Sequence, residues 1–213
     1  LHKMKKTISI LLTIILTLSL AACAAKSPAA SGDIGVDSAK ALLDTVWNSY
    51  SEDEKFPAAG GDFSEENMTD GAPGAYSVAD ASELDRVLGL PEADGAQVDD
   101  AASLQHMMNA NTFTCGAFHL KSGADAAAIA EATRANIQNR QWLCGFPDKL
   151  AVAVVGDYLV ALFGAEDLVD SFTAKLSAAF PAAQIVADQL NAMNDDLVRL
   201  AEERDALAAE VAR

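Results

Sequence analysis

Apolar residues recur at helical spacing, about every 3.6 residues, in three stretches of the chain. The first stretch follows Asp37 and Ser38, either of which can cap a helix. Its apolar positions are Ala39, Leu42, Leu43, Val46, Trp47 and Tyr50. The second stretch covers 124–143, with Ala126, Ile129, Ala130, Thr133 and Ile137 on one face. The third begins at Glu166 and Asp167 and ends at Pro181, with Leu168, Val169, Phe172, Leu176 and Phe180 on its face. The pattern predicts three amphipathic helices.

Strand patterns lie between these helices. Residues 112–120 (TFTCGAFHL) alternate so that Phe113, Cys115 and Ala117 share one face of a strand. Residues 101–108 fit a helix by propensity and a strand by their position before 112–120, and the sequence leaves both open.

The strongest local pattern is 150–163 (LAVAVVGDYLVALF), in which two β-rich runs flank Gly156 and Asp157. Glycine at the first turn position predicts a hairpin with a type II′ turn. Pairing Val155 with Tyr158 leaves both faces of this hairpin apolar. Antiparallel sheets usually keep one face in water, so we expect the hairpin to be covered on both sides or to meet a partner.

Residues 51–100 have a different composition. They carry 14 acidic residues against Lys55 and Arg86, and glycines and prolines interrupt them repeatedly. The apolar residues of 84–88, stopped by Gly89, indicate one short helix. The aspartates near the end of the region lack the spacing of a calcium loop, which favours a solvated acidic loop.

The C-terminal stretch has apolar residues at alternating intervals of four and three, the a/d pattern of a coiled coil. Its positions are Val186, Leu190, Met193, Leu197, Leu200, Arg204, Leu207 and Val211, of which Arg204 is the one polar member. Such a stripe needs a partner to bury it, which could be a second copy, another protein or the chain's own domain. We take Leu190, Met193, Leu197, Leu200 and Leu207 as the candidate assembly seam.

Together these patterns predict an α+β fold with a small three- to four-stranded sheet that contains the β-hairpin. Helices pack on this sheet, and a coiled-coil-like helix follows at the C-terminal end. The predicted parts are a signal peptide (1–22), a flexible tether (23–36), an N-terminal helix with an acidic loop-rich region (37–100), an α+β domain (101–181) and a helical heptad tail (182–213).

The N-terminal residues indicate the cellular location of the protein. Met4 and two lysines precede the apolar run 8–20, which is shorter than the ~20 residues that span a bilayer but suits a secretory signal. The run ends in Leu20-Ala21-Ala22-Cys23, which resembles the lipobox of bacterial lipoproteins. This resemblance implies cleavage before Cys23 and a lipid on its sulfur. A plain signal peptide or an uncut anchor is the alternative.

Charge narrows the range of partners. The chain carries 15 basic and 31 acidic residues, a net charge of −16. Removal of 1–22 takes away Lys3, Lys5 and Lys6 and no acid, so the net charge falls to −19. Such a surface repels nucleic acid and anionic lipid, so membrane attachment would rest on the acyl chains.

Reactive residues are few. Cys115 and Cys144 could form a disulfide outside the cytoplasm, or remain two buried thiols. The remaining histidines, His106 and His119, have no companion ligands at a recognisable spacing, so no metal site is expected. The Met107-Met108 pair beside His106 is typical of a core or core edge.

Two arginines of the second predicted helix are candidate anion ligands. Arg134 and Arg140 could bind an anion, although solvent-facing charges are the simpler interpretation. No phosphate loop, nucleophile elbow or metalloprotease motif occurs, so the sequence indicates no catalytic residue and no cofactor.

The order of strand, long helix, aromatic-proline pair, hairpin and final helix resembles a family of bacterial lipoproteins described as domain of unknown function four-three-five-eight. The matching positions are Lys121, Arg140, Phe146-Pro147, the 156–160 run and Phe172, over roughly 101–180. The resemblance implies no known activity. We therefore expect a lipid-anchored, non-enzymatic protein on the extracytoplasmic face of the cell membrane. It would bind an envelope protein or assemble with its own copies through the C-terminal helix. The alternative is a solute-binding lipoprotein, with its ligand between the sheet and the acidic middle region.

Overall fold

The structure is a computed structural model that describes residues 34–142, 146–190 and 204. In chain order its elements are α2 (Ala39–Trp47), β1 (Ala58–Gly60), β2 (Thr69–Asp70), β3 (Gly74–Tyr76), α3 (Ala81–Glu83), the π-helical η1 (Leu84–Leu88), the 3₁₀-helical η2 (Glu92–Gln97), β4 (Val98–His106), β5 (Phe113–Leu120), α4 (Ala126–Gln138), β6 (Lys149–Val155), β7 (Tyr158–Gly164), α5 (Glu166–Ala179) and β8 (Gln184–Leu190).

All strands of the described residues belong to one antiparallel sheet of eight strands, in the order β2-β1-β4-β5-β7-β6-β8, with β3 also paired to β4. The prediction of a small three- to four-stranded sheet is therefore wrong. The missed strands come from 51–100, which supplies β1, β2 and β3, and from the start of the predicted helical tail, which supplies β8. The first three have only two or three residues each, too few to leave an alternating pattern.

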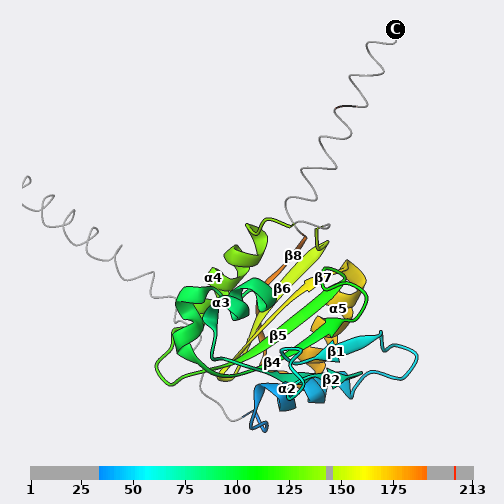
Figure 1. Ribbon diagram of the computed structural model, residues 1–213, viewed down its shortest axis with the longest axis horizontal. Helices are drawn as coiled ribbons and strands as arrows, with labels where there is room; N and C mark the ends of the chain where they lie inside the picture. Colours follow the sequence, from blue (N-terminus) through cyan, green and yellow to red (C-terminus); the bar gives the residue numbers. More distant parts are fainter. Residues whose placement is uncertain (1–33, 143–145, 191–203, 205–213) are drawn as a thin grey trace, which may run out of the picture.

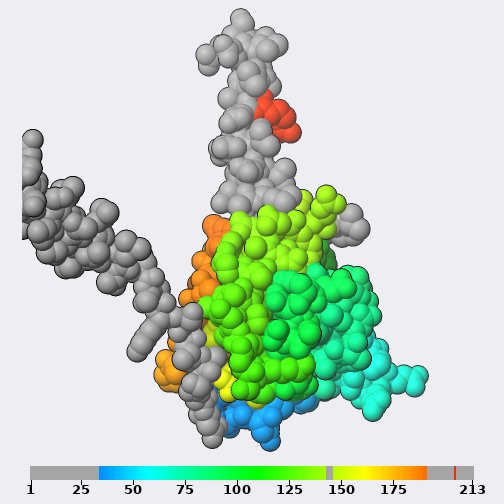
Figure 2. Space-filling view, turned by 90° about the vertical axis from the view of Figure 1, so that its left-hand side faces the viewer, coloured from blue at the N-terminus to red at the C-terminus, as the bar shows by residue number. Residues whose placement is uncertain are grey.

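Helices cover both faces of this sheet (Figure 1). On one face α2 and α5 enclose a core with residues such as Leu104, Phe113 and Val160. On the other face α4, with η1 beside it, encloses a second core that includes Phe118 and Leu159. Figure 2 shows the α4 side of the molecule, with α3 and η1 next to α4.

The three predicted helices are confirmed, and their buried faces are the predicted ones. Every predicted apolar position of α2 and α4 is buried, and α5 buries all of its stripe except the half-buried Leu168. Local caps fix where two of them begin: the Ser38 hydroxyl accepts from the N–H of Ala41, and the Asp125 carboxylate accepts from that of Ala128. Helix α4 ends at Gln138, five residues before the predicted end.

The hairpin prediction is also confirmed. Val155 pairs with Tyr158, and Gly156 has φ 59°, as the first position of a type II′ turn requires. Alternate residues of β6 and β7 enter the two different cores, so the hairpin is central and covered on both sides. Of residues 101–108, the first six belong to β4, which settles their ambiguity in favour of a strand, and Met107 and Met108 follow its end.

Two predicted boundaries need correction. Strand β4 spans Val98–His106 and so crosses the limit placed between residues 100 and 101. The main-chain N–H of Ala39 also donates to Asp100 Oδ2 at 2.7 Å, which joins α2 to the same unit. The tether prediction does not hold for Ile34 and Val36, which pack partly buried on the α2 side, while 23–33 lie outside the described residues.

The helical tail is wrong in its first part. Val186 and Leu190 belong to β8, which pairs with β6 in an antiparallel register. Without β8, the N–H and C=O groups along that edge of β6 would be unpaired. A heptad pattern describes one segment only, so it cannot indicate that a distant strand needs a pairing partner. Within the described ranges, no helix has the length and apolar character needed to cross a bilayer.

Candidate functional site

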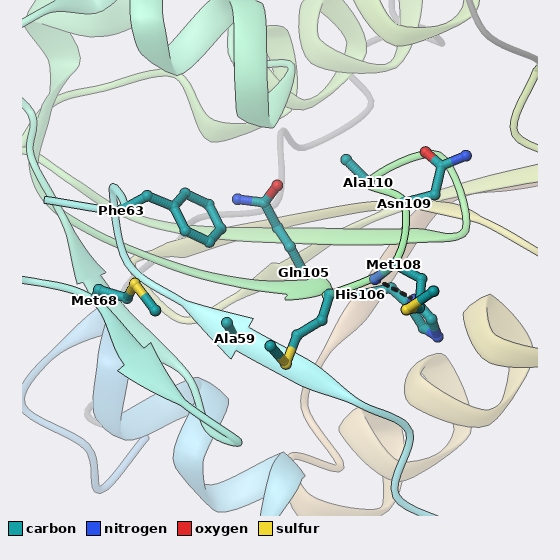
Figure 3. Close-up of a pocket in the computed structure, with 9 residues that line it drawn as sticks. Ala59, Phe63, Met68, Gln105, His106, Met108, Asn109 and Ala110 are labelled. Atoms are coloured by element: carbon teal, nitrogen blue, oxygen red, sulfur yellow. Dashed lines mark hydrogen bonds between the residues drawn. The ribbon is translucent and has the colours of Figure 1, made fainter.

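Two adjacent hollows on the α4 face share Phe63, Gln105 and Ala110, with volumes of about 300 and 310 Å³. We call them together the Gln105 groove. Figure 3 shows the first hollow, where the Phe63 ring and the Gln105 amide point toward each other from different elements. The groove lies between the sheet and the loop that joins β1 to β2, because Phe63 and Met68 come from that loop.

The floor of the groove is one row of neighbours across the sheet. Ala59 on β1 pairs with Gln105 on β4, Gln105 with Thr114 on β5, and Thr114 with Phe163 on β7. All four side chains line the groove and are buried. Directly opposed residues of neighbouring strands lie on the same face, so the register alone assembles this row. Helix α4 packs over other parts of β6 and β7 and ends at Gln138, near this end of the sheet.

Gln105 is the central residue of the row. Its side chain is 5% exposed, and its Nε2 is enclosed without a hydrogen-bond partner. Burial of an amide donor without a partner costs about 1–3 kcal/mol. Ser103, two residues earlier on the same face, avoids this cost because its hydroxyl bonds both the N–H and the C=O of Gly61.

Exposed apolar side chains form the rim of the groove. Phe63, Met68 and Met107 are each exposed by 50–56%, although they are large and apolar. Phe63 is also the one non-glycine residue with positive φ in the described chain, at 60°, a conformation that costs a bulky residue about 1–3 kcal/mol. The expectation that Met107 and Met108 form a core edge is wrong, since Met108 is 82% exposed.

The Asp62 carboxylate fixes the loop that carries Phe63. It accepts hydrogen bonds from the Ser64 hydroxyl, the Asn67 amide and the Ser77 N–H. Burial raises the pKa of Asp62, but these hydrogen bonds outweigh it and leave the pKa below its usual value. These hydrogen bonds hold the backbone beside Phe63, while the Phe63 ring itself is half exposed.

The second hollow has a cationic end. Arg86 and Arg140 line it together with Trp142 and Phe163. The Arg140 guanidinium lies 5.3 Å from the Trp142 ring centre and 5.9 Å from that of Phe163, within cation–π range. The simpler interpretation of Arg140 as a solvent-facing helix charge is thus wrong. Its side chain is only 16% exposed, and the residue lies beyond the end of α4.

Arg134 fits the simpler interpretation. It forms hydrogen bonds with Glu131 and Gln138 on α4 and does not line the groove. The two arginines are therefore not one anion site.

A second polar cluster lies elsewhere on β4 and β5. His119 Nδ1 is 2.5 Å from Asp99 Oδ1, and its ring packs against Tyr158 at 5.0 Å. A hollow of about 250 Å³ with Lys121 and Asp157 adjoins it. The sequence analysis missed this pair because a register shift between Val98 and Asp100 places Asp99 beside a residue 20 positions away. Both partners are one-third to one-half exposed, as is usual for a cross-strand surface pair.

His106 is held in the molecule as a structural residue. Its ring stacks on Phe56 at 5.5 Å, and its Nδ1 accepts from the N–H of Met108. Among the described residues, no group of three or more histidine, cysteine or acidic side chains is placed to hold a metal ion.

The remaining predicted site residues divide between described and undescribed parts. Cys115 is fully buried with a free thiol, and burial raises its pKa. Its proposed partner Cys144 and the lipidation residue Cys23 lie outside the described residues. So do four residues of the assembly seam, Met193, Leu197, Leu200 and Leu207, whereas Leu190 is 47% exposed on β8.

Gln105 and Phe63 are not among the site residues predicted from the sequence. A weak signal for Gln105 exists, because Ser103 and Gln105 are polar residues on alternate positions of an otherwise apolar strand. Nothing in the sequence indicates that Phe63 adopts a left-handed conformation.

No family model, no curated protein and no solved structure matches this chain. The resemblance to the lipoprotein family of unknown function therefore stays an expectation from the sequence.

Proposed function

We propose that the protein is a lipid-anchored, extracytoplasmic binding protein that acts without catalysis, and that the Gln105 groove is its binding site. The observation that carries this proposal is the enclosed Gln105 amide, which has no partner for its Nε2 and lies on the floor of a groove with an exposed apolar rim. Ligand sites typically combine an apolar lining with a few polar groups in volumes of about 300–1,000 Å³.

The lining of the groove favours ligand binding over catalysis. Among the described residues, neither hollow is lined by a carboxylate, a cysteine or a serine, and the His106 ring is engaged by Phe56 and by the N–H of Met108. Methionine side chains adapt to ligands of different shapes, which suits the rim formed by Met68 and Met107. The site also lies between the sheet and the acidic middle region, the place expected for a solute-binding protein.

The anchor rests on the sequence of residues 4–23 alone. Replacement Cys23→Ser should abolish incorporation of labelled palmitate and release the protein from the membrane fraction, since lipid attachment needs the thiol. Retention of the variant in the membrane would contradict the anchor, and it would leave the groove proposal unaffected.

Binding can be tested through the methionine methyl groups. The chain has five methionines, and three of them, Met68, Met107 and Met108, line the groove. We expect an extract of the host's envelope to shift the resonances of these three methionines in ¹³C-methyl spectra of the mature chain.

A matched pair of variants provides the control. Ala110 is exposed and lines both hollows, so Ala110→Trp should fill the groove and abolish the shifts. Ala79 is equally exposed but lines neither hollow, so Ala79→Trp should preserve them. The proposal fails when the extract shifts no groove methionine, or when Ala110→Trp responds as the unchanged protein does.

A further inference from the structure

The charge of the groove is opposite to that of the protein. The whole chain has about twice as many acidic as basic residues, with a net charge of −16. Yet the two formal charges among the described lining residues are both positive, Arg86 and Arg140. A cationic patch on an acidic protein attracts an anion locally while the remaining surface repels it.

The positive charge of Arg140 is only partly balanced by its neighbours. Its two terminal nitrogens donate to the main-chain carbonyls of Asp85 and Arg86, and its nearest carboxylate, on Asp85, is 3.6 Å away. Burial lowers the pKa of Arg140 against the opposing effect of Asp85. Within the described chain, the guanidinium contacts two carbonyls, the rings of Trp142 and Phe163 and one carboxylate at a longer distance, so it gains from a further anionic partner.

Arg86 differs from Arg140 in this respect. It is 70% exposed and paired with Glu83, so its charge is already satisfied at the surface. The anionic end of a ligand therefore belongs at Arg140.

The unsatisfied polar atoms of the groove are also donors. Five buried side-chain atoms of the described residues lack a partner, and two of them belong to the lining, Gln105 Nε2 and Trp142 Nε1. Both can only donate a hydrogen bond. Like the Arg140 guanidinium, both groups are N–H donors, so the polar part of the groove favours a ligand whose polar group accepts hydrogen bonds.

We propose that the Gln105 groove binds a small organic carboxylate with an apolar body, whose carboxylate pairs with Arg140 and whose body lies against Trp142 and the rim residues Phe63 and Met107. This inference rests on the proposed function and names the class of its ligand. Bidentate pairing with a carboxylate is the geometry for which a guanidinium is best suited.

Phe63 regulates access to the floor. Its ring and the Gln105 amide point toward each other (Figure 3), and the amide nitrogen is enclosed in this arrangement. A ligand reaches the amide when the Phe63 ring moves outward or when the amide turns by half a rotation. Release of the positive φ at Phe63 favours the first of these movements.

The test compares carboxylates with their neutral amides. Phenylacetate, phenylbutyrate and octanoate are titrated against phenylacetamide, phenylbutyramide and octanamide, with the full chain in lipid nanodiscs. The chain has two tryptophans, so its ¹⁵N spectrum has two indole signals, of which Trp142 belongs to the groove. We expect a carboxylate to shift the Trp142 signal and the groove methionines, with an affinity about tenfold above that of its amide.

Three variants locate the charge. Arg140→Gln should remove the preference, so that a carboxylate and its amide bind with similar affinity, and the ¹⁵N spectrum of residues outside the groove shows whether the variant is folded. Arg140→Lys should restore part of the preference, because lysine keeps the charge and loses the fork. Arg134→Gln is the matched control, since Arg134 lies outside the groove, and it should retain the full preference.

Each outcome separates this inference from the proposed function. Amides that bind in the groove as tightly as their carboxylates overturn the carboxylate assignment and leave a neutral-ligand groove. An unchanged preference in Arg140→Gln overturns the role of Arg140. When neither the probes nor the envelope extract shifts a groove signal, the binding function itself fails.

Discussion

Two polar residues of one strand face, Ser103 and Gln105, have opposite energetic consequences. Ser103 is completely buried, and its hydroxyl bonds both main-chain groups of Gly61. Gln105 is buried almost as fully and leaves its Nε2 unpaired. At the scale of single residues, Ser103 stabilises the fold, while Gln105 lowers its stability in a place where a ligand can recover the loss.

Unfolding measurements can distinguish these two roles. Gln105→Met keeps the volume and removes the unpaired donor, so we expect the free energy of unfolding in urea to stay equal or to rise. Ser103→Ala should lower it by about 1–3 kcal/mol, because the N–H and C=O of Gly61 lose their partner. An equal loss of stability in both variants would mean that Gln105 contributes to the fold as Ser103 does.

At the scale of elements, β8 is the strand that local patterns placed in the wrong class. It forms the edge of the sheet, and three of its apolar residues, Ile185, Val186 and Leu190, are 39–47% exposed. Lys149 on β6 connects it to the helix layer, with its ammonium 2.8 Å from Asp188 on β8 and 2.5 Å from Asp170 on α5.

Lys149 should set the local stability of β8. We expect Lys149→Met to increase amide hydrogen exchange along β8, because two carboxylates lose their shared cation. Lys40→Met is the matched control, since Lys40 forms one pair with Asp44 in which both side chains are more than one-third exposed, and such pairs contribute little. Unchanged exchange in β8 of the Lys149 variant would contradict this role.

The same lysine predicts a pH dependence. Hydrogen bonds to Asp170 and Asp188 raise the pKa of Lys149 above its usual 10.5. The contribution of Lys149 to the free energy of unfolding is therefore complete below pH 10.5, and it is lost as the pH rises through the higher pKa of the folded state. Burial also raises the pKa of Tyr50 and of Tyr76 to about 12, so their ionisation at high pH lowers the free energy of unfolding as well. The difference between wild type and Lys149→Met in urea unfolding, measured from pH 9 to 12, isolates the lysine; a constant difference would refute the prediction.

At the scale of the whole molecule, one sheet unites regions that the sequence analysis had separated. The acidic 51–100 region contributes β1, β2 and β3 to the same sheet as the predicted α+β domain. The groove forms where that region meets β4 and β5, so it depends on both halves of the chain.

The strand assignment of β8 also changes the expected assembly. With Val186 and Leu190 in the sheet, the seam begins at Met193, and Arg204 occupies one of its positions. So short a seam should give weak self-association, which sedimentation of the full chain with Cys23→Ser should show as a dimer that dissociates at low micromolar concentration. Arg204→Leu should strengthen the dimer and Leu200→Asp should abolish it. Indifference of the association to both changes would place the interface elsewhere.

The sequence by itself determined the elements whose signals are local. Helices α2, α4 and α5 follow from the 3.6-residue spacing of their apolar residues, and the β6–β7 hairpin follows from Gly156 and the runs beside it. In each case the residues that decide the structure lie within one or two turns of each other, so their pattern can be read along the chain.

Only the tertiary structure decided the rest, because the deciding partners are distant in sequence. Strand β8 exists because β6 offers an open edge, and Asp99 meets His119 through a register shift. The Gln105 groove depends on a row of side chains from β1, β4, β5 and β7, on Phe63 above it and on Arg140 beyond the end of α4. Cross-strand register and the packing of one layer on another bring these groups together, and neither leaves a periodic trace in the sequence.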